Sequence, residues 1–503
     1  MEALNIGSRR EVCWDEALID TAENIRVQMH TPEYRGEVMK WDAPWEGSGA
    51  GCLSIVAAEG LLRMYYVGAE MDVNELGKEH IRPGVMCCAE SRDGVHFTRS
   101  TVNERSFDGL GENNLLPTPD GVTLAVFRDT NPACPSEERY KALCGEFAGK
   151  HDSLWLFVSP DGLHFEKKHP LIADGAFDSL NIVFWDDATQ QYFLYYRGYH
   201  GEQTDGDRPL AWTTPPKIET DEDLEIAAHC LGLIRDIRVR TSKDLVHWSE
   251  PQRLQYGACD DLEMYTNNIQ KYYRAPHMFI GFPMRYIDRY KDAHNYPLLP
   301  DWNHRQELIR IWPRVGTAMT DAAVMTSRDG INFRRTEEAF LTPRADWGFA
   351  WYYGDGELCC GMAQTPSAVA GAPDEISLYA GTGYRARNVS LCRWAVRLDG
   401  FFSWRCDYTP GRIVTKPLVF AGDTLHINFS TSAFGGVRIR LLDETGEAIP
   451  GYDSGVHFGD SVERKVPFEK PLAALAGKTV RMEFTMRDAD LYSFKFHETP
   501  VIR

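Results

Sequence analysis

One short phrase recurs five times along this chain of 503 residues, and it limits the folds that the chain can adopt. Each copy contains an Asp, followed by Gly in four of the five, and ends on an aromatic residue; the copies span residues 91–97, 159–165, 242–248, 327–333 and 397–402. The steps between equivalent positions are 68, 83, 85 and 70 residues. Internal repetition at such a spacing is typical of repeat architectures.

Each copy predicts a tight turn between two antiparallel strands, because glycine tolerates positive φ. The residues before the turn are apolar and extended, as at 84–89 and 153–158, and two further strand candidates precede each phrase, as at 181–185 and 191–196. Four such strands make one antiparallel blade, and a ring of blades leaves only short, protected edges. We therefore expect an all-β fold with a five-bladed β-propeller over residues 1–405.

The pattern of the chain changes near residue 405. Beyond it, strand candidates with alternating polar and apolar residues are separated by short turns; they span residues 412–420, 424–430, 436–442, 479–485 and 491–496. Such alternation is typical of an antiparallel β-sandwich. The sequence predicts this second domain over residues 406–503, packed on the propeller and covering an edge, with carbohydrate binding as an alternative role.

The charge of the chain argues against two classes of partner. There are 73 acidic and 54 basic residues, for a net charge of −19. Nucleic acid and anionic membrane surfaces both need a basic footprint, so neither is expected. No run of about 18 apolar residues exists, and the first residues contain no apolar signal core. Homo-oligomers remain compatible with the sequence.

Twelve cysteines are scattered along the chain, with adjacent pairs at 87–88 and 359–360. None has the spacing of a zinc site, and many lie in apolar strand candidates, where a free cysteine behaves as a small hydrophobe. A reduced, cytoplasmic protein without a cofactor is the simpler interpretation. An axial divalent ion such as calcium would fit a propeller, but no motif supports it.

Acidic residues recur where the innermost strands of the predicted blades begin. Sixteen residues after the turn position of the second, third and fourth copies stand Asp178, Asp261 and Asp346. In a propeller these positions surround one mouth of the central funnel. Aspartate at the start of a strand is also common as a turn cap, and that structural alternative stays open for each residue.

Three side chains at the second of these positions share one face at the period of a strand: Asp261, Glu263 and Tyr265. Glycoside hydrolysis needs two carboxyl groups flanking the scissile bond, one as acid and the other as base or nucleophile. We predict Asp178, Asp261 and Glu263 as the catalytic set, with Glu263 as the general acid.

Further candidates lie near the same predicted mouth. Arginines that end the second strands of blades would clamp hydroxyls or neutralise the acids, and tryptophans beside acids would stack on sugars or belong to the core. Second-rank catalytic candidates are Asp42, Glu46, Asp129 and Asp346. Predicted substrate contacts are Arg197, Arg285, Arg385, Trp45, Trp347, Asn114 and Tyr265.

With these motifs, the chain resembles the five-bladed propeller glycoside hydrolases: the invertase and levanase group and the arabinofuranosidase and xylosidase group. The sequence here most similar to their Asn-Asp-Pro motif is at residues 41–44. Their Arg-Asp-Pro motif corresponds by strand register to residues 177–179, although a literal Arg-Asp with a later Pro occurs at 128–132. Their Glu-Cys acid is missing, and Glu263 is its nearest substitute. The resemblance implies a glycosidase. If the funnel is closed at one end, we expect exo-action on a small oligosaccharide or furanoside.

Three alternatives remain open. Sialidases repeat a related turn, but with Asp and Gly apart and in six units. A non-catalytic propeller would bind glycan or protein without turnover. A phosphate-dependent glycoside phosphorylase of the same fold would use the arginines to bind phosphate and need only one acid.

Overall fold

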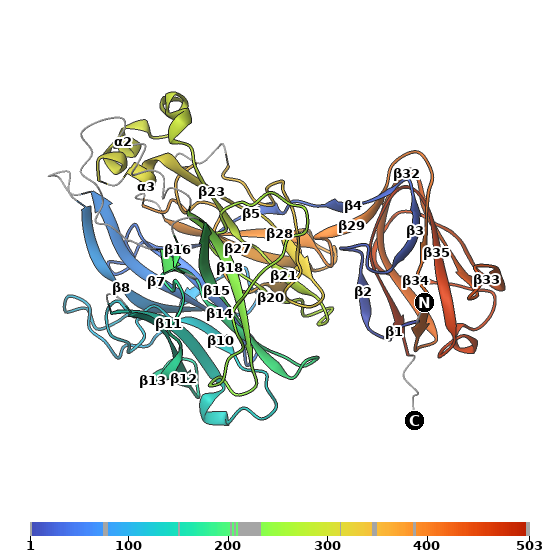
Figure 1. Ribbon diagram of the computed structural model, residues 1–503, viewed down its shortest axis with the longest axis horizontal. Coiled ribbons are helices and arrows are strands. Elements are labelled where there is room, and N and C mark those ends of the chain that lie inside the picture. Colours follow the sequence, from blue (N-terminus) through green and yellow to red (C-terminus); the bar gives the residue numbers. More distant parts are fainter. Residues whose placement is uncertain are drawn as a thin grey trace.

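The structure is a computed structural model that describes residues 3–73, 79–148, 151–201, 204–205, 208–209, 233–311, 313–344, 350–385 and 389–498. The chain forms a large β-propeller joined to a smaller β-sandwich-like unit that holds both ends of the chain (Figure 1). Among the described helices, none is long and apolar enough to cross a membrane.

Five four-stranded antiparallel sheets in the described residues are the predicted blades. Blade 1 contains β6 (Gly51–Ala58), β7 (Leu61–Val73), β8 (Glu79–Ser91) and β9 (Thr98–Arg99). Blade 2 contains β10 (Ala125–Arg128), β11 (Tyr140–Ala148), β12 (His151–Ser159) and β13 (Glu166–Ile172). Blade 3 contains β14 (Ile182–Asp186), β15 (Gln191–Gly201), β18 (Leu233–Ser242) and β19 (Gln252–Arg253), with a small ribbon of β16 (Thr204–Asp205) and β17 (Arg208–Pro209).

The last two blades depart from the simple repeat. Blade 4 contains β20 (Gln270–Lys271), β21 (Phe279–Gly281), β24 (Met325–Ser327) and β25 (Arg334–Arg335), and carries the extra pair β22 (Met284–Asp288) and β23 (Ala318–Ala322). Blade 5 contains β26 (Ala363–Thr365), β27 (Glu375–Thr382) and β28 (Ser390–Arg397), and its fourth strand is β5 (Glu33–Lys40) from the start of the chain. The ring is therefore closed by pairing of β5 with β28.

The first four copies of the repeated phrase form the turn between the third and fourth strands of a blade. In the second copy, the backbone N–H of Gly162 donates to Ser159 Oγ at 2.9 Å, and the N–H of Leu163 donates to Asp161 Oδ1 at 2.8 Å. His164 Nδ1 lies 2.7 Å from Asp161 Oδ2. Burial alone would raise the pKa of Asp161, but these hydrogen bonds outweigh it and lower the pKa. The serine and aspartate thus shape the turn locally.

The same turns join neighbouring blades. Tyr65 of blade 1 donates its hydroxyl to the carbonyl of Gly162 in blade 2 at 2.9 Å, and Tyr195 of blade 3 donates to the carbonyl of Gly330 in blade 4 at 2.8 Å. By strand register, Leu143 takes the tyrosine's place in blade 2. In the next blade, blade 3, the turn has Leu245 in place of glycine. Leu143 and Leu245 belong to one hydrophobic cluster. The interface between blades therefore explains the departure of the third copy from Asp-Gly.

A helical insertion separates β22 from β23 in blade 4. It consists of the 3-10 helix η2 (Tyr290–Leu298) and the helices α2 (Trp302–Ile311) and α3 (Pro313–Thr317) (Figure 1). Arg305 of α2 is fully buried and donates to the carbonyl oxygens of Gly316 at 2.9 Å and Trp351 at 2.7 Å. The insertion is thereby tied to the segment that leads into blade 5.

The second unit contains eleven strands from both ends of the chain. Its strands are β1 (Leu4–Gly7), β2 (Arg10–Val12), β3 (Ile19–Glu23), β4 (Ile25–Met29), β29 (Phe402–Cys406), β30 (Gly411–Thr415), β31 (Leu418–Phe420), β32 (Thr424–Leu442), β33 (Ala448–His457), β34 (Asp460–Val466) and β35 (Thr479–His497), with the 3-10 helix η3 (Leu472–Ala474). The sequence analysis assigned residues 1–405 to the propeller, whereas β1–β4 pair here with β31, β35, β30 and β29. Pairing between residues so far apart leaves no local signal in the sequence.

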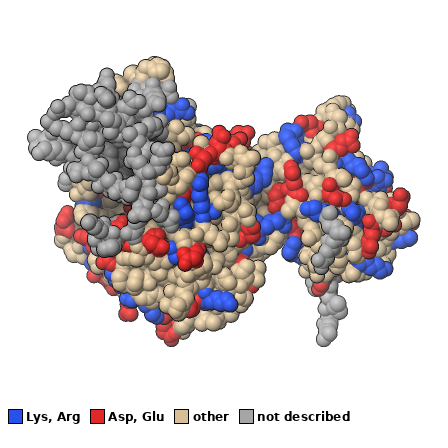
Figure 2. Space-filling view, in the orientation of Figure 1, with Lys and Arg blue, Asp and Glu red and all other residues tan. Residues whose placement is uncertain are grey.

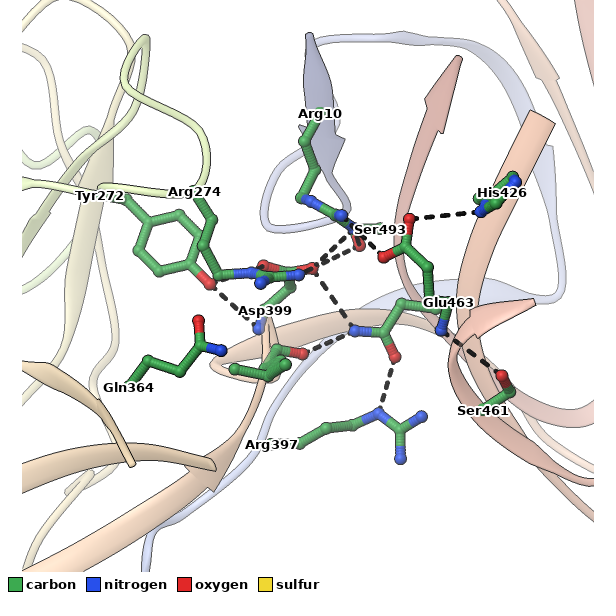
Figure 3. Close-up of polar contacts among 12 residues, drawn as sticks. Arg10, Tyr272, Arg274, Gln364, Arg397, Asp399, His426, Ser461, Glu463 and Ser493 are labelled. Carbon is green, nitrogen blue, oxygen red and sulfur yellow. Dashed lines mark hydrogen bonds and ion pairs between the residues drawn. The ribbon is translucent and has the colours of Figure 1, made fainter. Parts of the chain in front are cut away.

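The fifth copy of the phrase joins the two units (Figure 3). Asp399 is fully buried, and its carboxylate accepts from Arg10 at 3.1 Å, from Arg274 at 2.7 Å and from the hydroxyl of Tyr272 at 2.6 Å. Ser493 of β35 adds a hydrogen bond at 2.6 Å. Arg10 and Ser493 come from the sandwich, and Tyr272 and Arg274 from blade 4, so one aspartate binds both units.

The structure contains one disulfide, which the sequence analysis did not expect. Cys52 of β6 and Cys359, which precedes β26, are bonded with their Cα atoms 5.5 Å apart. The two residues are 307 positions apart in sequence and connect blade 1 to blade 5. No spacing rule relates cysteines that far apart. The other described cysteines are free, as predicted.

Candidate active site

A cavity of about 300 Å³ lies where the innermost strands of the five blades converge. Each blade contributes to its wall: Leu53, Thr123, the segment 177–181, Tyr265 and Glu357 come from blades 1 to 5 in order. The lining is mixed, with carboxylates, tyrosine rings and aliphatic side chains. The volume is at the lower limit for small-molecule sites.

Asp178 lines this cavity, immediately before the innermost strand of blade 3. Its carboxylate forms an ion pair with Arg197 of β15. The backbone N–H of Ala176 donates to the carbonyl of Arg197 at 3.2 Å, which holds the segment before Asp178 against β15. The side chain of Asp178 is 41% exposed, while that of Arg197 is 2% exposed. A buried cation thus presents an accessible carboxylate to the cavity.

Glu357 is the second carboxyl group in the cavity, and the sequence analysis missed it. It stands 27 residues after Gly330, whereas Asp178 stands 16 after Gly162, so a fixed offset from the turn does not find it. Burial raises the pKa of Glu357 to about 7. No cation of the described residues forms a salt bridge with it. The two carboxyl groups of one cavity therefore have contrasting surroundings.

Three tyrosines, Tyr265, Tyr353 and Tyr384, also line the cavity. Tyr265 stacks on Tyr286 with centroids 5.9 Å apart and meets Tyr353 edge-on at 5.4 Å. Tyr353 and Tyr265 are also joined through their hydroxyl groups, and Tyr384 lies 6.3 Å from Tyr353. Tyrosine combines an apolar ring with a polar hydroxyl, which suits a ligand that has both apolar and hydroxylated surfaces.

Glu263, the predicted general acid, is ion-paired with Arg235 of β18 and is not among the residues that line the cavity. Arg235 lies over the ring of Tyr265 at 5.6 Å, as Arg197 does at 5.1 Å. The Arg235–Glu263 pair therefore lies next to a cavity-lining tyrosine. A carboxylate held by a guanidinium is better suited to positioning than to proton donation.

Asp261 lies outside the cavity. Its carboxylate contacts His200 at 2.7 Å and accepts from Arg253 at 2.6 Å, and half of the side chain is exposed. The structure therefore separates Asp261 from Asp178, with which the sequence analysis had grouped it.

The candidates of blade 1 form a buried hydrogen-bond network. Glu46 is fully buried and accepts from Tyr66 at 2.7 Å and from Arg99 at 2.6 Å. Arg99 also binds the exposed Asp42 at 2.9 Å. Trp45 is buried and donates to Asn114 at 2.9 Å. None of the four predicted residues is among those that line the cavity.

The other candidates also lie away from the cavity lining. Asp129 is buried against Lys141 at 2.8 Å, and Arg285 binds Asp321 through two nitrogens, each at 2.6 Å. Arg385 follows the cavity residue Tyr384 and lies 5.8 Å from its ring centroid. Asp346 and Trp347 lie outside the described residues.

Acidic and basic side chains are interspersed on the viewed face of both units (Figure 2). Within the described residues, the cavity contains no group of three potential metal ligands. The chemistry that the cavity offers therefore depends on Asp178, Glu357 and the tyrosines.

No protein-family profile matches the chain, and no curated protein does. Solved structures do match over most of it. They include a glycoside hydrolase family 43 arabinoxylan arabinofuranohydrolase from Bacillus subtilis (12% identity, 90% of this chain and 96% of that chain covered, TM-score 0.35) and the GH32 β-fructofuranosidase of Bombyx mori (10%, 92% and 94%, 0.38). A β-1,2-mannobiose phosphorylase from Listeria innocua matches at 13% identity, with 72% and 95% covered and a TM-score of 0.39. Glycoside hydrolases of propeller fold are thus among the structures similar to this chain, and the five-bladed propeller expected from the sequence resemblance is present.

Proposed function

We propose that this protein is a glycoside hydrolase that uses Asp178 and Glu357 as its two catalytic carboxyl groups. The observation that carries the proposal is their placement in one cavity with contrasting surroundings: Asp178 is ion-paired with Arg197, and burial raises the pKa of Glu357 to about 7. Two carboxyl groups whose environments separate their protonation behaviour are the usual arrangement for an acid and a base.

In this proposal, protonated Glu357 donates its proton to the glycosidic oxygen as the bond to the leaving group breaks. Ionised Asp178 acts as the base or nucleophile and stabilises positive charge on the sugar ring. Arg197 positions Asp178, and Tyr265, Tyr353 and Tyr384 hold the sugar. Glu263 keeps Arg235 in place beside Tyr265, which replaces its predicted role as general acid.

The size of the cavity supports action at the end of a glycan. About 300 Å³ suits a terminal sugar unit better than an internal segment of a long chain. The substrate class proposed is therefore a small oligosaccharide or furanoside with an accessible non-reducing end.

The test is hydrolysis of a panel of para-nitrophenyl furanosides and pyranosides by the wild type, Glu357→Gln, Asp178→Asn and Asp261→Asn. We expect the first two variants to lose about 10²-fold or more in kcat, since general acid–base catalysis contributes about 10²–10⁴-fold. Asp261→Asn, outside the cavity, is the matched control and should retain turnover.

Parallel assays with inorganic phosphate separate hydrolysis from phosphorolysis. Turnover that requires phosphate would replace this proposal with a phosphorylase. Binding of a glycan without turnover by folded wild-type protein would replace it with a binding propeller. Undiminished turnover by Glu357→Gln would refute the assignment of the acid.

A further inference from the structure

Two histidines and a glutamate gather on the sandwich, far in sequence from the cavity residues. Glu463 Oε1 lies 2.9 Å from His497 Nε2 and 3.4 Å from His426 Nδ1. All three donor atoms lie within 4.8 Å of one another, and the two imidazole rings have centroids 4.4 Å apart. Two nitrogen donors and one oxygen donor thus lie close together.

Strand register produces this grouping. β32 lies between β34 and β35, and His426 of β32 is opposite both Lys465 and Lys495. His497 lies two residues beyond Lys495 on β35, and Glu463 lies two residues before Lys465 on β34. Because side chains alternate along a strand, the three residues share one face. Three adjacent strands therefore contribute one ligand each.

The distances suit a tetrahedral zinc ion. Zinc binds imidazole nitrogen and carboxylate oxygen at about 2.0–2.2 Å, which places neighbouring tetrahedral donors about 3.3 Å apart. The separations from Glu463 Oε1 to His497 Nε2 and His426 Nδ1, 2.9 and 3.4 Å, bracket this value. His426 Nδ1 is buried, and the Glu463 carboxylate lies 3.4 Å from it.

The second carboxylate oxygen of Glu463, Oε2, has a hydrogen-bond partner outside the cluster. Arg10 Nη2 donates to Glu463 Oε2 at 2.8 Å, while Arg10 Nη1 donates to Asp399 and Ser493, each at 3.1 Å (Figure 3). Partners of this kind orient metal ligands and are part of most metal sites. They also connect the cluster to the joint between the two units.

We propose that His426, His497 and Glu463 bind one zinc ion, with water as the fourth ligand. Three protein ligands and an open position are a common zinc arrangement. Lys465 lies opposite His426 and repels a cation, so we expect an affinity in the micromolar range. The bound ion would fix the orientation of Glu463 and, through Arg10, the joint at Asp399.

The experiment uses the full chain, freed of metal by chelation and titrated with ZnCl₂ by calorimetry, with bound zinc counted by mass spectrometry. The variants are His426→Ala, His497→Ala and the control His169→Ala, whose ring contacts only a neighbouring carbonyl. We expect one zinc per chain for the wild type and the control, and at least tenfold weaker binding for each cluster variant. Circular dichroism of the metal-free variants establishes that they are folded.

A second measurement compares the thermal unfolding temperature with and without zinc. It tests whether zinc bound at the cluster stabilises the folded chain, as expected if the ion fixes the joint at Asp399 through Glu463 and Arg10. The expected result is a higher unfolding temperature with zinc for the wild type and the control, and no shift for the double variant His426→Ala/His497→Ala. The proposal is overturned if wild-type protein binds no zinc at micromolar to millimolar concentrations, or if the double variant binds it equally well.

Discussion

At the scale of single residues, Glu357 combines a chemical advantage with a cost in stability. Burial raises the pKa of its carboxyl from 4.5 to about 7. In the unfolded chain the group ionises near pH 4.5, so the folded state binds more protons between these two values. The contribution of Glu357 to the free energy of unfolding is therefore most favourable below pH 4.5. It decreases as pH rises, until the carboxyl group of the folded state ionises near pH 7. The cost amounts to about 3 kcal/mol above that pH.

Replacement of Glu357 by glutamine should remove this cost together with the acid. We expect Glu357→Gln to be more stable than the wild type by up to about 3 kcal/mol at pH 8, with the difference falling to about 1 kcal/mol at pH 5. Wild-type kcat/KM should fall as pH rises through 7, because the proton donor is lost. Denaturant unfolding at the two pH values and a pH–rate profile measure both effects.

Glu263→Gln serves as the comparison. Its carboxylate is paired with Arg235, so its removal leaves a buried guanidinium without its partner and should destabilise at both pH values. A stability gain for Glu263→Gln, or none for Glu357→Gln at pH 8, would contradict the contrast drawn between the two groups.

At the scale of elements, the turns connect blades as well as strands. Gly162 has a φ of 77°, and a Cβ added there would lie 2.6 Å from the hydroxyl oxygen of Tyr65. Gly109 also has a positive φ, 84°, but an added Cβ would meet nothing within 4 Å. A comparison of alanine substitutions at Gly162 and Gly109 therefore separates the cost of backbone strain from the cost of crowding between blades.

Gly162→Ala should destabilise the propeller by about 2–4 kcal/mol, and Gly109→Ala by about 1 kcal/mol. Adding Tyr65→Phe to Gly162→Ala removes the crowded hydroxyl and should recover part of the loss. A double-mutant cycle by denaturant unfolding measures the coupling. Equal losses for the two glycine variants would mean that the hydroxyl contact across the blades contributes little.

The repeated turns and the cavity differ in how much the sequence reveals of them. The turn at residues 159–162 is held by hydrogen bonds among Ser159, Asp161 and Gly162. Because these residues are adjacent in sequence, the pattern predicts the turn directly. The connection from the turn at Gly162 to the start of blade 3 is short, so the offset of 16 residues leads to Asp178, which lines the cavity. Glu357 follows a longer connection after blade 4, and β5 pairs with a strand about 350 residues away, so neither has a local signature.

At the scale of the whole molecule, one buried carboxylate, Asp399, contacts both the propeller and the sandwich. Burial alone would raise the pKa of Asp399, but Arg10 and Arg274 outweigh it and lower the pKa. The group is thus a buried anion whose removal takes a carboxylate partner from both Arg10 and Arg274. Breaking a buried pair in this way typically costs about 3–5 kcal/mol.

Asp399→Ala should therefore weaken the coupling between the two units as well as overall stability. We expect calorimetry to show two separate unfolding transitions where the wild type shows one. Asp407→Ala is the matched control, because Asp407 also binds an arginine, Arg26, but is 61% exposed, and such pairs contribute little. Separation of transitions in the control, or their coincidence in Asp399→Ala, would show that the joint depends on other contacts.

The closing of the ring by β5, and of the sandwich by β1–β4, has a consequence for synthesis on the ribosome. The first forty residues emerge early, but their partner strands β28 and β29 begin only at residues 390 and 402. At about 5–20 residues per second, the early strands wait roughly 20–70 s without partners. Unpaired strand edges are templates for aggregation. Strands β4 and β5 therefore stay open to chaperones until residues 390–406 have been synthesised.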